Sequence, residues 1–511
     1  MTIRKDRIGE PILIDDVKSY LPPNHPCFLV EKIVNRVDFS EWEEEHWDNP
    51  GNPAYHPRVL LRGVVQGYID GVKSGCQVGR KVKTDLAYIY LCGEDGPDFR
   101  TFNRFYKEFA NVIVCTIVET IYYAKEIGMM TLGVLGLDST TIKANTSTYN
   151  VANEKQINAI LKTVYDIILK NKQEDELFSD ESGDEVPINL EDNEEFEKYY
   201  QKAIEYAKEQ LDDEKLKFPA RKQLKNAILN PERTIENLET ALKNLHESGQ
   251  NTVNLTDNKC RWHHNKKNYE ECGYYVQNIV ELNSGLTMLS QATPIATDSG
   301  QFVPMFELFE DIYGSIGNEI PLDADYGYWG EETLKEINKH GWNAYIPNKL
   351  IASCSKKSPN DIDKFSDYNF IFSDDLSYCT CPKGQKLLKH ELEMTKKGLK
   401  TSYHVDHSVI CKYCPDHDRF CQFKRIKEII VYQEDPETDM FMKMQTERGR
   451  KIYEPRFSRG ESPFGLAKEH KGMRQARAKG TYNMTIQALL TSIATNIIKI
   501  NNYEIKNEKN T

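Results

Sequence analysis

Residues 319–348, EIPLDADYGYWGEETLKEINKHGWNAYIPN, constrain the fold more than any other stretch of the chain. Their pattern predicts a short apolar strand, a glycine-containing turn, an amphipathic helix and a second strand. This order is typical of α/β proteins, in which helices connect the strands of one sheet. The first strand runs directly into two carboxylates, Asp323 and Asp325. The sequence therefore predicts an α/β core with acidic side chains at a strand end.

An earlier stretch repeats this pattern. Residues 133–150, GVLGLDSTTIKANTSTYN, open as an apolar strand that we expect to end at Asp138. Functional residues of open α/β sheets collect beyond the strand ends, and Mg²⁺ prefers one or two carboxylates together with water and substrate phosphate. Asp138 and the acidic end of the later strand, Asp323 and Asp325, are therefore candidate ligands of a shared divalent metal if the two strands are neighbours. Taken alone, Asp138 is more often a strand-end cap or turn residue, and Asp325 before Tyr-Gly is an ordinary turn signal.

Glu461 offers a third carboxylate, in the most basic part of the chain. The 511 residues carry a net charge of −12, but residues 171–214 alone hold 17 Asp or Glu and 4 Lys. Residues 449–480 hold 9 Lys or Arg against 3 Glu. The acidity is therefore local, and the basic segment around Glu461 suits a phosphodiester backbone. The alternative for Glu461 is an ordinary salt-bridge partner.

Several blocks of the sequence together resemble the DDE transposases of bacterial insertion sequences, in the branch with a helical N-terminal domain and a late cysteine cluster. The blocks similar to that family's catalytic motifs are GLDSTTIKANTS (136–147), TDSGQFVPMFE (297–307), DADYGYWGEETL (323–334) and ESPFGLAK (461–468). Those similar to its N-terminal DNA-binding module are NPAYHPRVLLRGVVQGYIDGVKSG (52–75) and GPDFRTFNRFYKEF (96–109). The resemblance implies catalytic roles for Asp138, Asp325, Glu461 and Lys468. The three carboxylates would hold Mg²⁺ or Mn²⁺, and Asp323 is then a neighbour rather than a ligand.

The activity implied by the resemblance is cleavage of DNA at the ends of a mobile element, followed by joining of the freed 3′-hydroxyl to target DNA. Two metal ions about 3.5–4 Å apart suit this phosphoryl transfer. The implied partners are terminal inverted repeats and target duplex, held by a homodimer. Two alternatives stay open, namely a nuclease of the same fold that does not join, and a domesticated protein that only binds DNA. A phosphatase based on Asp323 and Asp325 is weaker, because Gly327 stands where such a motif has Thr or Val.

The resemblance and the charge pattern predict four parts, with a ribonuclease-H-like α/β catalytic domain at the centre. The expected parts are a helical DNA-binding domain (1–125), the catalytic domain (126–150, 251–350 and 435–511), an acidic helical insert (151–250) and a cysteine-rich insert (351–434). Within the catalytic domain, CGYYVQNIVEL (272–282) and GLTMLSQATPIA (285–296) predict a hairpin around Asn283–Gly285. Residues 481–500, TYNMTIQALLTSIATNIIKI, predict a terminal helix packed on the core rather than a membrane span.

The cysteine-rich insert is a candidate zinc site. The N-terminus lacks the apolar segment of a signal peptide, so we expect a cytoplasmic, nucleoid-associated protein whose cysteines are reduced. Four thiols in the order Cys381, Cys411, Cys414 and Cys421 suit tetrahedral Zn²⁺, and free buried thiols are the alternative. The other cysteines are expected in the core: Cys27, Cys76, Cys92, Cys115, Cys260, Cys272 and Cys354.

Two groups of basic residues are candidate DNA contacts. The first group lies in the N-terminal module, and the second follows Glu461 with a three-residue step that suits one side of a helix tracking a DNA backbone. The candidates are Arg58, Arg62, Arg100, Arg104, Lys107, Lys471, Arg474 and Arg477. On charge alone, each is also compatible with a solvated helix face.

Overall fold

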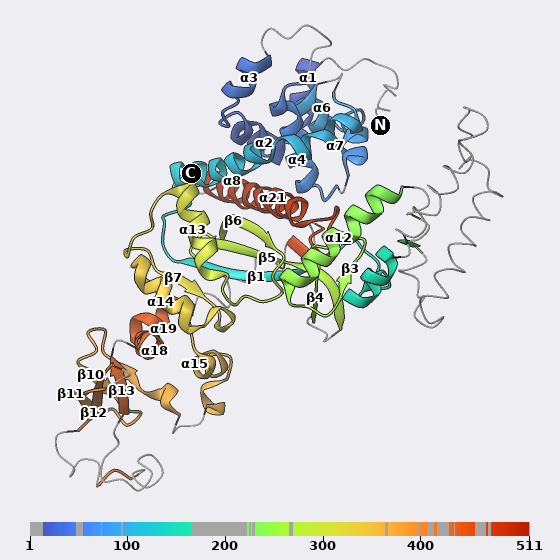
Figure 1. Ribbon diagram of the computed structural model, residues 1–511. Coiled ribbons are helices and arrows are strands. Elements are labelled where there is room, and N and C mark those ends of the chain that lie inside the picture. Colours follow the sequence, from blue (N-terminus) through green and yellow to red (C-terminus); the bar gives the residue numbers. More distant parts are fainter. Residues whose placement is uncertain are drawn as a thin grey trace.

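The computed structural model describes most of the 511 residues. The described residues are 14–46, 55–72, 74–93, 96–162, 164, 222–223, 226, 230–264, 269–362, 366–395, 398–405, 413–415, 429–433, 435–454, 465, 467–468 and 472–509. Figure 1 shows their arrangement, in which a group of N-terminal helices and a small second sheet lie at opposite ends of a central sheet.

The N-terminal part is helical, as the spacing of its apolar residues predicts. Local caps fix where the helices begin, since Asp85 and Asp98 accept backbone N–H groups of the following turns and Pro26 and Pro57 occupy first-turn positions. The helices are α1 (Ile14–Tyr20), α2 (Pro26–Val34), α3 (Ser40–His46), α4 (Pro57–Ile69), α5 (Gly75–Lys81), α6 (Leu86–Cys92), α7 (Phe99–Glu108) and α8 (Ala110–Glu126).

The central sheet has six strands and mixed direction. Its path runs β4-β5-β1-β7-β8, and β6 pairs with the same edge of β5 as β4 does. β5 is antiparallel to β1, β4 and β6, whereas β1, β7 and β8 run parallel. The strands are β1 (Leu135–Lys143), β4 (Arg261–His264), β5 (Glu270–Glu281), β6 (Leu286–Thr293), β7 (Leu322–Ala324) and β8 (Ala344–Tyr345). The mixed α/β class predicted from the sequence is confirmed.

Both predicted connections of this sheet are confirmed. β5 and β6 form a hairpin whose turn holds Asn283 and Gly285, and the positive φ of Gly285 is a conformation that suits glycine. Between β7 and β8 the chain forms the 3₁₀ turn η2 (Tyr326–Tyr328) and the helix α14 (Glu331–His340). Helix α13 (Phe302–Tyr313) joins β6 to β7, and its Phe302 and Phe306 belong to the main apolar cluster.

The terminal helix α21 (Thr481–Glu508) packs on the core, as predicted. It lies between the central sheet and the N-terminal helices (Figure 1) and contacts β6, α8, α4 and α2. Buried Asn496 accepts the N–H of Thr287 at 3.0 Å, donates to the Thr287 carbonyl at 2.8 Å and donates to the Thr120 hydroxyl at 3.1 Å. Among the described helices, none combines the length and apolar character needed to cross a bilayer.

The described part of the predicted acidic insert has a small core of its own. Strands β2 (Val151–Ala152) and β3 (Val253–Asn254) pair at its base, and α12 (Pro231–Ser248) is its long helix. Ile157, Leu238 and Leu245 belong to one buried cluster, which is separate from the main core. The acidic tract 171–214 lies outside the described residues.

A second, five-stranded sheet follows the central one along the chain. It is antiparallel, in the order β13-β12-β11-β10-β9, and its buried face contains Phe372, Leu387, Tyr403 and Val431. Its strands are β9 (Ile371–Phe372), β10 (Tyr378–Thr380), β11 (Lys386–Thr395), β12 (Gly398–His404) and β13 (Ile429–Gln433). Along the chain, short helices precede and follow it: α15 (Lys349–Cys354), η3 (Pro359–Asp361), η4 (Asp367–Asn369), α18 (Pro436–Met444) and α19 (Glu447–Tyr453).

Candidate active site

Asp138 lies within β1 and not at its end. The expectation that the strand ends at this residue is wrong, because the long strand β5 pairs with β1 as far as Lys143 and Gly273. The parallel neighbour β7 is shorter, and its last residue, Ala324, pairs with Leu137. Asp138 is therefore the first residue of β1 beyond the parallel ladder, and its side chain is partly exposed.

Asp325 lies beside Asp138. Since Leu137 pairs with Ala324, the next residues on these two parallel strands are the two aspartates. Neighbouring strands are about 4.8 Å apart, and residues at matching positions project to the same face of a sheet. Asp325 is also partly exposed. The fold thus brings together two carboxylates that are 187 residues apart in the sequence.

The backbone that follows each aspartate orients its carboxylate. Asp138 Oδ1 accepts the N–H of Ser139 at 2.8 Å, and Asp325 Oδ1 accepts the N–H of Tyr326 at 2.6 Å. Asp325 thereby caps η2, whose last residue, Tyr328, donates its own N–H to the Asp325 carbonyl at 3.1 Å. Both carboxylates are therefore held in place by local hydrogen bonds and still reach solvent.

A buried network fixes the turn after Asp325 to the sheet. The hydroxyl of Tyr328 donates to Gln277 Oε1, and Gln277 Nε2 donates to Asp298 Oδ1 at 3.1 Å. Tyr328 and Gln277 are completely buried. A Cβ at Gly327 would lie 3.0 Å from Asp298 Oδ2, so a larger residue there would displace this carboxylate. The network connects β5, the residues before α13 and the turn that carries Asp325.

Asp323 occupies a more interior position than Asp325. It lies two residues earlier on β7, pairs with Gly136 and is fully buried. Alternation along the strand places its side chain on the same face as Asp325.

The segment after Glu461 returns to the end of β1. Lys143 forms a parallel bridge with Gln475, its carbonyl accepts the N–H of Ala476 at 2.8 Å, and its N–H donates to the Arg474 carbonyl at 3.3 Å. Ala467 belongs to the same buried cluster as Ile142, which lies four residues after Asp138. Lys468 is described and partly exposed, whereas Glu461 lies outside the described residues.

Two family models match the chain. One, described as a transposase DDE domain, matches residues 380–501, and the other, described as a transposase domain (DUF772), matches residues 15–108. The chain belongs to the DDE transposases of bacterial insertion sequences. No curated protein matches it. The first match includes Glu461 and Lys468, and the second includes the N-terminal module recognised in the sequence.

The donor set of this transposase suits a hard divalent cation. Asp138 and Asp325 supply carboxylate oxygens side by side, and two such charges repel each other unless a cation or a proton lies between them. Mg²⁺ is held by this kind of ligand, together with water and phosphate oxygens. Within the described residues, no group of three or more Asp, Glu, His or Cys side chains forms a complete metal cage. The described pair supplies two of the three carboxylates of the predicted ligand set, and the predicted third, Glu461, lies outside the described residues.

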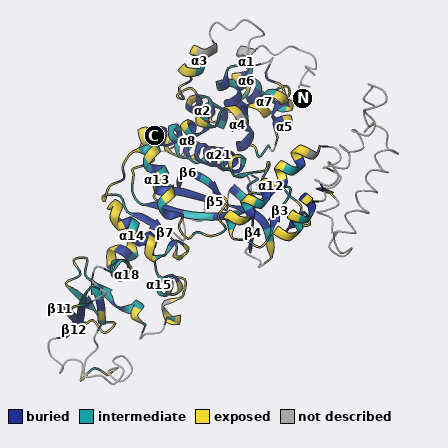
Figure 2. Ribbon diagram, in the orientation of Figure 1, coloured by how far each residue is buried: buried dark blue, intermediate teal, exposed yellow. Residues whose placement is uncertain are grey.

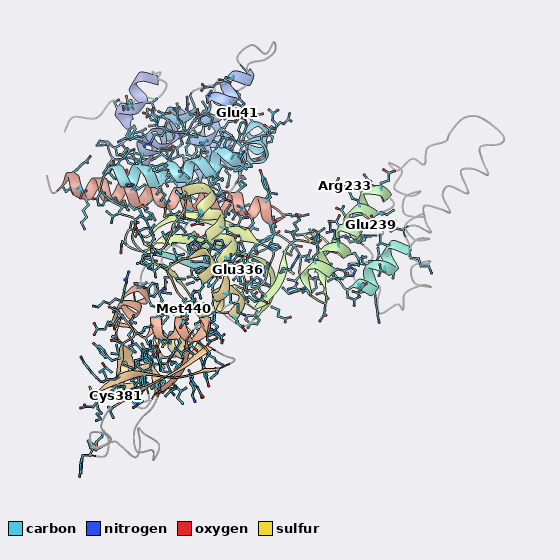
Figure 3. The ribbon with its side chains drawn as sticks, turned by 60° about the vertical axis from the view of Figure 1, so that its left-hand side comes forward. Glu41, Arg233, Glu239, Glu336, Cys381 and Met440 are labelled. Atoms are coloured by element: carbon cyan, nitrogen blue, oxygen red, sulfur yellow. The ribbon has the colours of Figure 1, made fainter. Side chains whose placement is uncertain are left out.

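The cysteines of the transposase divide into buried and accessible ones. Cys381 lies in the turn after β10, in the small sheet at the far end of the molecule (Figure 3), and is partly exposed, as is Cys414. Cys411 and Cys421 lie outside the described residues. Cys379 is packed in the small-sheet core, and burial raises the pKa of its thiol to about 12. Of the seven cysteines predicted for the core, five are buried, but for Cys76 and Cys115 the prediction is wrong because both are exposed.

The predicted DNA-contact residues differ in their surroundings. Arg100 and Arg104 are exposed on α7, and Arg474 is exposed beside β1. The remaining described candidates make contacts within the protein: the Arg58 guanidinium lies 4.9 Å from the Phe39 ring centroid, Arg62 donates to Asn35, and the Arg477 guanidinium lies 4.2 Å from the Tyr68 ring centroid. Burial lowers the pKa of Arg62. Lys471 and the side chain of Lys107 lie outside the described residues.

The network of Tyr328, Gln277 and Asp298 was not found by reasoning from the sequence. The sequence carries two signals for it. Gln277 and Asn278 are consecutive polar residues inside an apolar strand, and Asp298 lies in the TDSGQF block, which the resemblance marks without assigning it a role. Neither signal reveals that the three side chains meet, because they come from segments that only the tertiary fold brings together.

Proposed function

We propose that this transposase cleaves the ends of its mobile element and joins the freed 3′-hydroxyl to target DNA at a site built on Asp138, Asp325 and Glu461. The observation that carries the proposal is the register of β1 and β7, which makes Asp138 and Asp325 neighbours at the point where the parallel ladder ends. Family membership supports a transposase function, and the site geometry supports metal-dependent chemistry at these two residues.

In this proposal the three carboxylates hold two divalent ions, Mg²⁺ or Mn²⁺. When bound, the ions activate the attacking oxygen and stabilise the charge on the leaving oxygen. The protein's part is to fix the ligands, which the N–H groups of Ser139 and Tyr326 do for Asp138 and Asp325. Lys468, a cation at neutral pH, would contact the negatively charged DNA near the cleaved bond.

The chain length between Glu461 and Ala467 is compatible with Glu461 as the third ligand. Glu461 lies six residues before Ala467 in the sequence, and Ala467 belongs to the same buried cluster as Ile142 of β1. Six residues of extended chain span at most about 20 Å, a length that allows Glu461 to approach Asp138.

The sheet topology supports a ribonuclease-H-like catalytic domain. In the sheet, the neighbouring strands β1, β5 and β6 are antiparallel to one another. The strands β7 and β8 follow them along the chain after helical connections and run parallel to β1. We propose the division made from the sequence: a DNA-binding domain (1–125), a catalytic domain (126–150, 251–350 and 435–511), an acidic insert (151–250) and a cysteine-rich insert (351–434).

Helix α7 is the proposed DNA-contact helix of the N-terminal domain. Its Phe102 and Phe105 are fully buried, whereas Arg100 and Arg104 are exposed one turn apart. On the side of α5, a Cβ at Gly79 would lie 3.1 Å from the Phe99 backbone nitrogen, so the glycine allows close packing of the two helices. An exposed basic face on a rigidly packed helix is suited to phosphate and base contacts.

The proposal includes a homodimer on DNA and a structural zinc ion at Cys381, Cys411, Cys414 and Cys421. The mass of the complex with two element ends tests the homodimer, with one protein chain per DNA end as the expected ratio.

Elemental analysis of purified, reduced protein tests the zinc site. One zinc per chain is expected, and folded protein without zinc would exclude the site.

The test of the main proposal is Asp138→Asn, assayed with DNA carrying the terminal repeats in Mg²⁺. We expect the variant to bind this DNA as the natural protein does, because one partly exposed carboxylate is removed, but not to cut it. Normal cleavage by the variant would refute the assignment. Pre-cut ends then separate the two enzymatic alternatives, since a transposase joins them to a target duplex and a nuclease does not.

A further inference from the structure

A cavity of about 550 Å³ lies on the edge of the central sheet, away from the two aspartates. At this edge β4 and β6 pair with successive halves of β5, and the cavity includes Arg261 of β4 and residues 294–297, which follow β6. The end of α12 and the first residue of α21, Thr481, complete its lining. Three separate parts of the chain therefore enclose it: the insert, the sheet and the terminal helix.

Arg261 is the charged group that makes this cavity unusual. Only 6% of the residue is exposed. Its Nη1 donates to the carbonyls of Asn258 at 2.9 Å and Cys260 at 3.0 Å, whereas its Nε has no hydrogen-bond partner among the described residues. No described carboxylate lies within ion-pair distance of its guanidinium. Burial lowers the pKa of Arg261, although the charges of Asp257 and Glu247 act in the opposite direction. A buried cation without an ion-pair partner is costly, and an anionic ligand would remove that cost.

The rest of the lining also favours an anion. Lys259 is exposed at the cavity, and Thr297 and Thr481 contribute hydroxyl groups. Thr481 begins a 28-residue helix, and helix N-termini attract negative charge. At the N-cap of this helix, the N–H of Gly480 donates to the Tyr274 hydroxyl at 2.7 Å and to the buried Asp257 Oδ2 at 3.3 Å. The one carboxylate in the lining, Glu247, is exposed and lies 4.0 Å from Lys243. Its opposing effect is therefore weakened by solvent and by its own partner.

We propose that this cavity binds a phosphate group of the DNA backbone, in the same duplex that is cut at Asp138 and Asp325. This inference rests on the proposed function. Arg261 pairs with Gly273, five residues along β5 from Asn278, the partner of Asp138. Five residues along the strands and two strands across amount to about 20 Å. This distance corresponds to about six base pairs of duplex, so the contacted phosphate lies roughly six positions from the cleaved bond.

The test is DNA in which single phosphates are replaced one at a time by uncharged methylphosphonates. For the natural protein we expect a loss of affinity of about tenfold at one or two adjacent positions, which is the loss typical of one charge-assisted hydrogen bond. Arg261→Gln should weaken binding of unmodified DNA by a similar factor and should show no further loss at those positions. The matched control is Arg233→Gln. Arg233 is exposed on α12 (Figure 3) and is not among the residues that line the cavity, so this variant should keep the full sensitivity of the natural protein.

Two results would overturn the inference. In the first, every methylphosphonate weakens DNA binding by Arg261→Gln as much as it weakens binding by the natural protein. In the second, Arg261→Gln binds unmodified DNA with unchanged affinity. Circular dichroism must show that this variant is folded. If it is not, the variant Lys259→Gln, which changes an exposed residue, is tested with the same methylphosphonate DNAs instead. The loss of affinity caused by a methylphosphonate at the same positions should then be smaller than for the natural protein. The absence of that reduction would equally overturn the inference. The proposed function fails separately, when the natural protein cuts none of these duplexes in Mg²⁺.

Discussion

The two sheets of this transposase are covered to very different extents (Figure 2). In the central sheet almost all of β5 and β6 is buried, because helices and loops cover both faces. In the small sheet β11 is exposed along most of its length, and its Leu392 and Met394 are 48% and 69% exposed. A sheet buried on both faces holds its side chains in single positions. The comparison indicates that the central sheet, which carries Asp138 and the turn with Asp325, is the more rigid of the two sheets.

Helix α18 joins these two regions through alternate side chains. Met440 and Met444, one turn apart, are buried in the main apolar cluster, whereas Met442, between them, is buried in the core of the small sheet. The two cores therefore share one helix and one partly buried side chain, Phe441, which packs against both. Substitutions on its two sides can separate the contributions of the two sheets.

The largest expected difference between the sheets concerns their carboxylates. Asp325→Asn should lower DNA cleavage by on the order of 10³-fold, the loss seen when one preorganised group that stabilises transition-state charge is removed. Asp375 in the small sheet is the control. Hydrogen bonds from Ser373 and Ser377 lower its pKa to about 2, so it is an ionised carboxylate at neutral pH. Asp375→Asn should leave cleavage within twofold in gel assays, and a comparable loss for both variants would contradict the division of roles.

A second difference concerns stability. Met442→Ala should destabilise the small sheet by about 2–5 kcal/mol, because it leaves a cavity at a fully buried site. Hydrogen exchange should then increase in β11 and β12 but not in β5 and β6, and cleavage should persist. Met444→Ala, two residues further along α18, should instead increase hydrogen exchange around β8. Equal increases in both sheets after either substitution would show that the two cores unfold as one unit.

A smaller effect is expected at Tyr328, the last residue of the turn that follows Asp325. Tyr328→Phe leaves Gln277 Oε1 without its buried donor, which costs about 1–3 kcal/mol. Since Tyr328 fixes the turn that carries Asp325, the variant should also need a higher Mg²⁺ concentration for half-maximal cleavage. Tyr403→Phe is the matched change in the small sheet, where the fully buried Tyr403 donates to the Leu376 carbonyl at 2.8 Å. It should cost similar stability without changing the Mg²⁺ requirement.

The sequence predicts most of the elements but fewer of the contacts between them. The β5–β6 hairpin, the unit from β7 to β8 and α21 all follow from local patterns, because turn residues and apolar spacing are short-range signals. The adjacency of Asp138 and Asp325 was expected from the resemblance, but the continuation of β1 past Asp138 was not. That continuation depends on the length of β5, its distant partner.

Side-chain surroundings are the least predictable feature. Arg477 occupies a basic segment, and its sequence gives no indication that it stacks on Tyr68, more than 400 residues earlier. The same holds for the exposed Cys76 and Cys115, which composition alone assigns to the core. Charge and hydrophobicity predict a residue's average environment, whereas its actual neighbours depend on how separate elements pack.

The smallest expected effect is a pH dependence from two partly buried lysines that contact the central sheet from different helices. Burial lowers the pKa of Lys443 in α18 to about 8, and it does the same for Lys499 in α21. Between about pH 8 and 10.5 each lysine is protonated in the unfolded chain and neutral in the folded one, so the free energy of unfolding should rise with pH across this window. The ammonium of Lys443 lies 4.3 Å from the Tyr345 ring centroid, whereas Lys499 donates to the Gly285 carbonyl in the β5–β6 turn.

Lys443→Met should therefore raise the stability at pH 7 by on the order of 1 kcal/mol and reduce the rise toward pH 10.5. Lys499→Met should reduce the rise equally but stabilise less at pH 7, because it also removes a hydrogen bond between α21 and the β5–β6 turn. Urea unfolding at several pH values measures both quantities, and the exposed Lys339→Met should change neither. Identical gains for the two variants at pH 7 would show that the hydrogen bond to Gly285 adds nothing to the stability of the central sheet.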